Sequence, residues 1–186
     1  MPELTAAQKT ALKADIAANA NTIPAGRPFA GTAINAMPNS PDANFEIARW
    51  YSLLFPAVDF WVWRSSVSKG ELVNSVSPDG TTFNWVGNGF ITRSVGEQTA
   101  WKELFNGTNT VNPSLANVRQ AFADIFSGTG NAASNRTHLL AVARRKANNI
   151  EKLLATAIGT GTTASPALAG YEGSVTGTQV EDARNS

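Results

Sequence analysis

One long stretch of the chain, residues 134–158, has the hydrophobic pattern of a single amphipathic helix. Its apolar positions recur at spacings of three, four and seven residues, which places them on one side of a helix. They are Leu139, Leu140, Ala143, Ala147, Ile150, Leu154 and Ala157. Gly159 follows, where a helix can end in a left-handed residue. The pattern predicts one continuous helix around which the rest of the chain is organised.

The first two helices of the chain are predicted from their N-terminal caps. Thr5 and Gln8 have the spacing of a capping box, which opens a helix over residues 6–19 with a thin apolar stripe. Ser40, followed directly by proline, opens the second helix, which is expected to end at Pro56. The face expected to be buried contains Phe45, Ala48, Tyr51 and Leu54, widened by Ile47, Trp50 and Phe55.

Two more helices precede the long one and are expected to pack against it. Ser94 and Glu97 form a second capping box, opening a helix that stops at Gly107. Asn112, again followed by proline, opens a helix that Gly128 closes. The apolar face of this last helix consists of Leu115, Val118, Phe122 and Ile125. Short Gly/Asn connections join these helices, which is typical of packed neighbours.

Several segments between the helices have weaker signals. Residues 19–41 contain many prolines and glycines, so we expect a loop that wraps the body or contacts a partner. Residues 59–67 suit either a short strand or a buried turn, and residues 69–75 suit one or two helical turns. Residues 76–93 include a turn signature and a glycine-rich centre, which predicts a small hairpin or a glycine-kinked loop.

The last segment, residues 159–186, has no helical period and few apolar residues. Leu168, Tyr171 and Val175 are spaced as in an arm that docks on a neighbouring subunit, although a flexible terminus explains the composition equally well. The predicted fold is mainly α, a bundle of about four to five helices. Residues 1–158 form this helical domain, with the 19–41 loop and the 76–93 insertion, and residues 159–186 form an extended C-terminal arm.

Composition limits the classes of protein to which the chain can belong. The chain has 186 residues, a net charge of +1, five Trp and nine Phe, and no Cys. It therefore has enough apolar residues for one core, no strong field for nucleic acid, and no thiolate or disulfide chemistry. No apolar run approaches the roughly 20 residues of a membrane span, and the N-terminus lacks the pattern of a signal peptide. We expect a protein that is made and used on the cytosolic side or released by lysis, with no membrane partner.

Candidate catalytic groups are sparse. His138 is the only histidine, and no second residue in the sequence is positioned to orient it as a base. The acids are scattered singly, without the spacing of a metal site, and several have helix caps as a sufficient explanation. The glycine pairs lack the lysine and the strand–loop–helix context of a phosphate loop. We therefore expect no enzyme activity, no metal and no cofactor.

The polar side of the long stretch is basic. Its cations are Arg136, Arg144, Arg145, Lys146 and Lys152. Such a face is most often solvated; it can also pair with acids of a neighbouring subunit, or contact DNA weakly and without sequence preference. Acids of the C-terminal segment could supply the subunit pairing.

The sequence Trp61-x-Trp63-Arg64 is the most unusual local motif. Core packing is the simplest explanation for at least one of the two tryptophans. The other can stack on Arg64 or anchor a subunit interface, where Trp and Arg are enriched.

Four segments together resemble a family of small virion proteins of tailed bacteriophages. They are the Val62-Trp63-Arg64 step, residues 93–97 (RSVGE), residues 118–128 (VRQAFADIFSG) and residues 151–173, with its GTGTTASPA run. The likeness extends over residues 59–177 and the first helix. This chain departs from the pattern at Thr92, where a glycine is expected, and in extra loop residues between 77 and 89.

The resemblance implies a structural role in the virion, assembled in the host cytoplasm. The plan of a helical body with a C-terminal arm is similar to head-to-tail adaptor proteins, which form a ring below the portal. The implied partners are further copies of this chain, the portal and tail proteins. Other virion roles, a capsid cement protein or a tail-tube terminator, fit the composition equally well. A DNA-associated regulatory protein is a further alternative.

Overall fold

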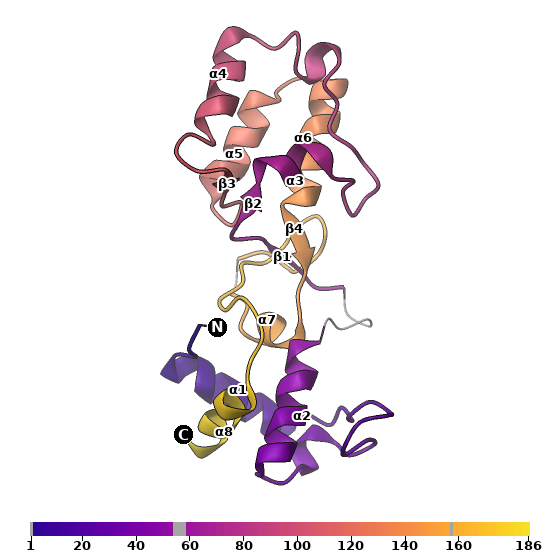
Figure 1. Ribbon diagram of the computed structural model, residues 1–186, viewed down its shortest axis with the longest axis vertical. Helices are drawn as coiled ribbons and strands as arrows, with labels where there is room; N and C mark the ends of the chain where they lie inside the picture. The colour runs from indigo at the N-terminus through magenta and orange to yellow at the C-terminus, as the bar shows by residue number, and fades with distance from the viewer. Residues whose placement is uncertain (1, 54–58, 157) are drawn as a thin grey trace. The chain divides into compact units, whose positions relative to one another are not determined.

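The computed structural model describes residues 2–53, 59–156 and 158–186 (Figure 1). The chain is mainly helical and divides into two compact units. Unit 1 comprises residues 1–60 and 146–186, and unit 2 comprises residues 61–145. The expected division into a helical domain of residues 1–158 and a separate arm is therefore wrong: the C-terminal segment belongs to the same unit as the N-terminal helices. Leu54, Phe55, Pro56 and Ala157, which entered the predictions above, lie outside the described residues.

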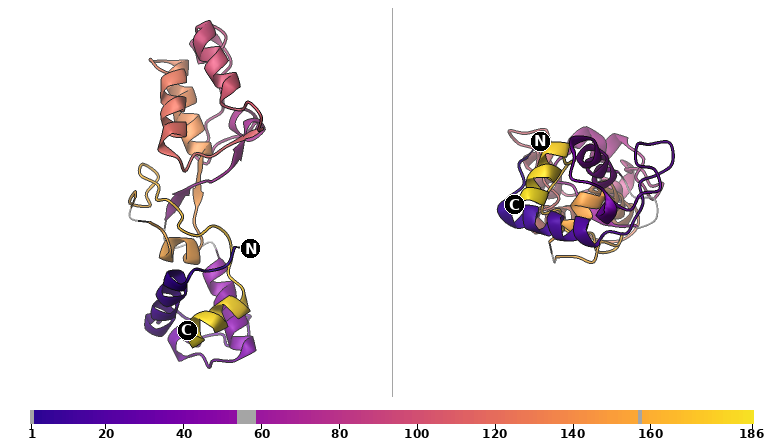
Figure 2. Two further views of the ribbon diagram at one scale, coloured as in Figure 1. Left: turned by 90° about the vertical axis from the view of Figure 1, so that its left-hand side faces the viewer. Right: turned by 90° about the horizontal axis from the view of Figure 1, so that it is seen from below.

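Unit 1 is built from the two ends of the chain. Its elements are α1 (Ala6–Ala18), the short 3-10 helix η1 (Ile34–Ala36), α2 (Pro41–Ser52), α7 (Asn149–Leu153) and α8 (Gly177–Asn185). Helix α8 packs against α1 and α2, and Figure 2 shows these three side by side. Side chains from all three meet in one core: Leu12, Ile16, Ile47, Tyr51, Val180 and Ala183.

The sequence predicted the starts of the first two helices of unit 1 correctly, but α2 ends at Ser52 and not at Pro56 as expected. Thr5 and Gln8 form the expected capping box, with Thr5 N donating to Gln8 Oε1 at 2.9 Å. Ser40 caps α2, and Pro41 is its first residue. Phe45, however, is 57% exposed instead of buried with Tyr51. The two residues are six positions apart, so they diverge around the helix, and the core takes Ile47 and Tyr51.

Unit 2 contains the remaining elements. They are β1 (Trp61–Trp63), β2 (Val67–Ser68), α3 (Lys69–Asn74), η2 (Gly87–Gly89), α4 (Val95–Glu103), β3 (Thr110–Val111), α5 (Ala116–Ile125), α6 (Asn131–Val142) and β4 (Arg144–Lys146), whose last residue belongs to unit 1. Strands β1 and β4 pair, and β2 pairs antiparallel with β3, Val67 opposite Val111. The core of unit 2 is rich in aromatic rings: Phe83, Trp101, Phe105, Phe122 and Phe126.

Local predictions in unit 2 had mixed outcomes. The short strand β1, the turns of α3 and the capping box that opens α4 are as expected. Residues 81–92, all described, form a glycine-kinked loop around η2 and not a hairpin. Helix α5 begins at Ala116 and not at Pro113, because Asn112 Oδ1 accepts from Ser114 N at 3.0 Å and forms a turn instead of a cap.

The single helix expected over residues 134–158 is wrong. Helix α6 ends at Val142, a strand follows, and α7 begins only at Asn149. The backbone between them is engaged elsewhere: Arg64 N donates to Ala143 O and Ala147 N donates to Phe60 O, each at 2.9 Å. A capping box formed by Asn148 and Glu151 then starts α7.

The extended arm expected over residues 159–186 is also wrong. The segment folds back first, with Thr156 N donating to Leu168 O at 2.9 Å, and its last residues form α8. Gly161 has a φ of 76°, and a Cβ there would lie 2.2 Å from Phe60 Cε2, so a larger residue at this bend would be strained and would displace the ring. Within the described residues the protein thus has eight α-helices, more than the predicted bundle.

Candidate functional site

The Trp61, Trp63 and Arg64 motif makes internal contacts within unit 2. Trp61 is buried, and the Arg144 guanidinium lies 5.6 Å from the centre of its ring. Trp63 is stacked by Arg119, at 4.6 Å, and not by Arg64. Arg64 instead pairs with Glu71, Nη2 to Oε1 at 2.7 Å. Each tryptophan has a cation–π contact, but Arg119 and Arg144 supply these contacts and not Arg64, the residue that the sequence suggested for one of them.

The predicted docking residues of the C-terminal segment lie in unit 1. Tyr171 and Val175 are buried in its core, and Leu168 is partly buried. Tyr171 Oη donates to Ser174 O at 2.7 Å, and burial raises the pKa of this phenol. These side chains therefore hold their own unit together.

The five predicted basic residues do not share a helix face. Arg136 lies on α6 and donates to Phe126 O at 2.6 Å. Arg144, Arg145 and Lys146 form β4, where alternate side chains point to opposite faces. Arg144 pairs with Asp79, and Lys146 Nζ lies 2.8 Å from Asp59 Oδ1. Lys152 is exposed on α7. The basic surface predicted from one continuous helix is therefore wrong, because that helix is interrupted.

The surroundings of His138 indicate a role in stabilising the fold. It is fully buried on α6, with Nε2 2.9 Å from Leu72 O and Nδ1 3.1 Å from Thr81 O. The imidazole thus ties α3 and the following turn to α6. Among the described residues, no group of His, Asp and Glu side chains is arranged to hold a metal ion.

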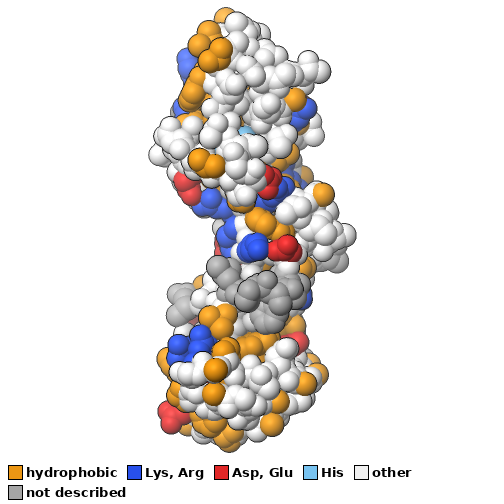
Figure 3. Space-filling model, turned by 90° about the vertical axis from the view of Figure 1, so that its right-hand side faces the viewer, with side chains coloured by type: hydrophobic (Ala, Val, Ile, Leu, Met, Phe, Trp, Pro, Cys, Tyr) orange, Lys and Arg blue, Asp and Glu red, His pale blue; other side chains and the backbone are white. Residues whose placement is uncertain are grey.

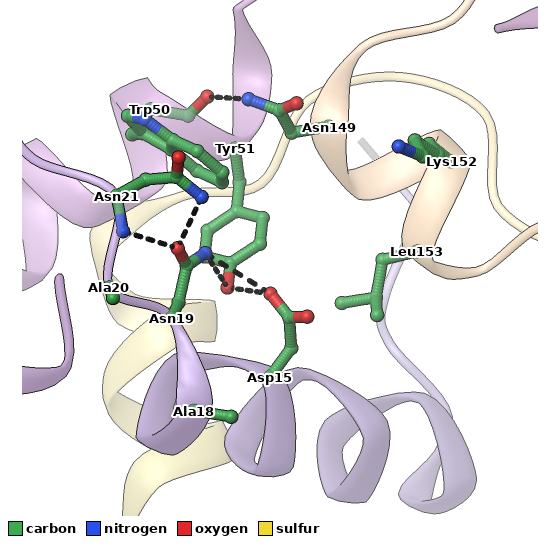
Figure 4. Close-up of a pocket in the computed structure, with 10 residues that line it drawn as sticks. All are labelled: Asp15, Ala18, Asn19, Ala20, Asn21, Trp50, Tyr51, Asn149, Lys152 and Leu153. Carbon is green, nitrogen blue, oxygen red and sulfur yellow. Dashed lines mark hydrogen bonds between the residues drawn. The ribbon is translucent and has the colours of Figure 1, made fainter. Parts of the chain in front are cut away.

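A polar hollow of about 540 Å³ lies in unit 1 between α1, α2 and α7 (Figure 4). Tyr51 Oη donates to Asp15, and Asn19 Nδ2 donates to both Tyr51 Oη and Asp15 Oδ2 at 3.3 Å. The side-chain Nδ2 of Asn21 donates to Asn19 Oδ1 at 2.8 Å. Burial, and next the hydrogen bond to Asp15, raise the pKa of Tyr51 well above its usual value. The phenol therefore stays protonated, and this network fixes the end of α1 on α2.

Unit 2 carries exposed large hydrophobic side chains on and beside the η2 loop. We name four of them the apolar loop surface: Trp85, Val86, Ile91 and Val95, with exposed fractions of 42%, 69%, 68% and 82%. Backbone hydrogen bonds close the loop, since Ile91 N donates to Trp85 O at 3.2 Å and Thr92 N donates to Gly87 O at 3.0 Å. Asn135 of α6 connects the loop to this helix, because its Nδ2 donates to Asn84 O and Gly89 O.

The apolar loop surface is the feature of unit 2 most suited to binding another protein. Exposed hydrophobic side chains favour burial against a partner, and a loop whose backbone is already closed by hydrogen bonds has less entropy to lose on binding. Hydrophobic side chains reach the surface of both units in the space-filling view (Figure 3). One signal for the loop surface is present in the sequence, the bulky residues around Gly87 and Gly89, but those residues suit a hairpin equally well.

Comparison with known proteins adds no relative: no family model, no curated protein and no solved structure matches the chain. None of the helices in the described part of the chain has the length and hydrophobicity needed to cross a membrane.

Proposed function

We propose that this protein is a structural component of the virion of a tailed bacteriophage, a head-to-tail adaptor that forms a ring below the portal. The apolar loop surface carries the proposal, because its residues are exposed in the single chain and suit burial against a neighbouring protein. The resemblance of residues 62–64, 93–97, 118–128 and 151–173 to phage virion proteins supplies the biological setting.

The internal role of His138 supports a mechanical function over a catalytic one. The only imidazole of the chain is buried, and both ring nitrogens lie near backbone carbonyl oxygens. A general base needs access to a substrate proton, which this position does not offer. Assembly would instead depend on buried apolar area, which is worth roughly 25 cal/mol per Å².

Localisation of the protein in purified phage particles tests the proposal. We expect one ring of copies between the portal and the tail in reconstructions of the particle. Copies spread over the shell would identify a cement protein, and copies at the end of the tail tube a terminator. Either of these results, or absence from the particle, would overturn the adaptor role.

The role of the apolar loop surface is tested by a paired substitution, Val86→Asp with Ile91→Asp. We expect the variant to fold, because both side chains are exposed, and to be missing from assembled particles. Val76→Asp is the matched control, since Val76 is 66% exposed on unit 2 but lies outside the apolar loop surface. Equal incorporation of both variants would remove the observation on which the proposal rests.

A further inference from the structure

A hollow of about 630 Å³ opens on unit 1 between α2 and the loop that precedes it. Its lining combines aromatic and charged side chains: Pro28, Phe29, Asp42, Phe45, Glu46 and Arg49. Two carboxylates face one guanidinium here, so the lining carries an excess of negative charge. None of these residues belongs to the apolar loop surface of unit 2.

Glu46 is the unusual member of this lining. It is only 2% exposed, and its Oε1 accepts from Arg49 Nη1 at 3.1 Å. Its Oε2 is buried without a hydrogen-bond partner in the structure. A buried carboxylate oxygen without a donor is costly, and most such groups in proteins are satisfied. Within the described residues, Oε2 therefore has an unused capacity to accept a hydrogen bond.

The aromatic walls of the hollow are also unusual. Phe29 has a φ of 60°, a conformation that a bulky side chain rarely adopts, and the turn around it is closed by Thr32 N donating to Phe29 O at 2.9 Å. Phe45 is more than half exposed, and the Arg49 guanidinium lies 5.9 Å from the centre of its ring. Strained residues of this kind often occur at binding sites.

We propose that this hollow binds an arginine side chain presented by a partner protein. A guanidinium is planar, donates several hydrogen bonds in a fixed fork and stacks on aromatic rings. It would donate to Glu46 Oε2, lie against Phe29 or Phe45, and gain from the charge of Asp42. Because Oε2 is buried, binding requires the Glu46 side chain to shift so that this oxygen meets the guanidinium. The hollow would bind such a side chain whether or not the protein sits in a phage neck.

Arg27 of the same chain is the competing occupant. It directly precedes Pro28, and its Nη1 is likewise buried without a hydrogen-bond partner. Its guanidinium is therefore an internal candidate for the same acceptor, Glu46 Oε2. The variant Arg27→Gln separates the two cases, because it removes the internal guanidinium and leaves the lining residues unchanged.

The test is a titration of the isotopically labelled full chain, followed by amide NMR. The probes are N-acetyl-arginine amide and its neutral isostere N-acetyl-citrulline amide. We expect the arginine probe to shift the amides of Phe29 and of residues 42–49, and the citrulline probe to bind at least about tenfold more weakly. Equal binding of the two probes, or no shift with either, would overturn the proposal.

Two substitutions test whether the Glu46 carboxylate binds the arginine probe. Glu46→Gln keeps the shape of the side chain and should weaken the arginine probe by about tenfold. Glu181→Gln, which removes an exposed acid of α8 in the same unit, should leave the binding unchanged. If Glu46→Gln binds as tightly as the wild type, the carboxylate does not recognise the probe. If only the Arg27→Gln variant binds the probe, the natural occupant is Arg27 and the proposed partner is wrong.

Discussion

Tyr51 shows how one buried hydroxyl links two helices of unit 1. Its ring is almost fully buried, its hydroxyl donates to Asp15 of α1, and it accepts from Asn19. Burial, followed by the hydrogen bond to Asp15, raises the pKa of the phenol, whereas the Asn19 hydrogen bond lowers it. The folded protein therefore holds this proton more tightly than the unfolded chain does.

The raised pKa of Tyr51 predicts a loss of stability at alkaline pH. The stabilisation is complete below the unfolded pKa of about 10, and the free energy of unfolding falls by about 1.4 kcal/mol per pH unit above it. Denaturant titrations at several pH values, on the wild type and on Tyr51→Phe, measure this slope. The difference in the free energy of unfolding between the two proteins should shrink as the pH rises past about 10. Parallel plots of this free energy against pH would show that Tyr51 is not the group responsible.

His138 is expected to stabilise unit 2. Replacement by Ala leaves a cavity beside Phe83 and removes the ring nitrogens that face Leu72 O and Thr81 O. We expect unit 2 to lose about 2–4 kcal/mol of stability. Thermal unfolding followed by tryptophan fluorescence measures the loss, and Thr137→Ala, at an exposed neighbouring position of α6, is the control. An unchanged melting temperature would mean that the imidazole does not hold these elements together.

The interrupted helix marks a limit of hydrophobic periodicity as a signal. Leu139 on α6 and Ile150 on α7 are both fully buried, and the spacing between them also fits an unbroken helix. Periodicity therefore could not reveal the strand between them. Pairing of β4 with β1 decides the outcome, and that pairing joins segments about eighty residues apart.

Caps were the more reliable signal at the scale of the element. The boxes at Thr5 and Ser94 predicted α1 and α4 with the correct first residues. The same spacing occurs at Asn148 and Thr176, where it opens α7 and α8. These two boxes were present in the sequence and would have indicated both the break in the long helix and the helix at the end of the chain.

Asn148 therefore carries a prediction for its helix. Its Oδ1 accepts from Glu151 N at 2.9 Å, and its Nδ2 donates to Gly173 O at 2.8 Å. Asn148→Ala should cost about 1–2 kcal/mol, and it should raise hydrogen exchange in α7 and around Gly173 together. Lys152→Ala, at an exposed position of α7, should change neither. Unaltered exchange in Asn148→Ala would show that the cap does not set the start of α7.

At the scale of the whole molecule, the sequence predicted a mainly helical protein but not its division into units. Chain length and composition predicted a single domain with one core. No sequence motif near residues 60 and 146 indicated that the boundaries between the two units lie there. The candidate interface was missed for a similar reason. Phe45 and the apolar loop surface are exposed because other hydrophobic side chains fill the two cores. The pattern of hydrophobic residues along the chain does not reveal which of them will be buried.

The C-terminal segment supplies the sharpest test of this division. Helix α8 buries Val180 and Ala183 in the core of unit 1, and Arg184 donates to Met37 O at 2.9 Å. Each core is a separate cluster of side chains, so damage to one should spare the other. A chain ending at Gly173 should therefore lose the fold of unit 1 and keep that of unit 2.

Hydrogen exchange with peptide resolution measures this outcome. Peptides from α1 and α2 should lose protection in the truncated chain, while peptides from α5 and α6 keep it. Val180→Asp should give the same pattern in the full-length chain, because it places a charge in the same core. Asp182→Asn, which alters only a surface ion pair with Lys9, is the control. Full protection of α1 and α2 after truncation would mean that the segment is a dispensable docking arm, and that unit 1 is complete without it.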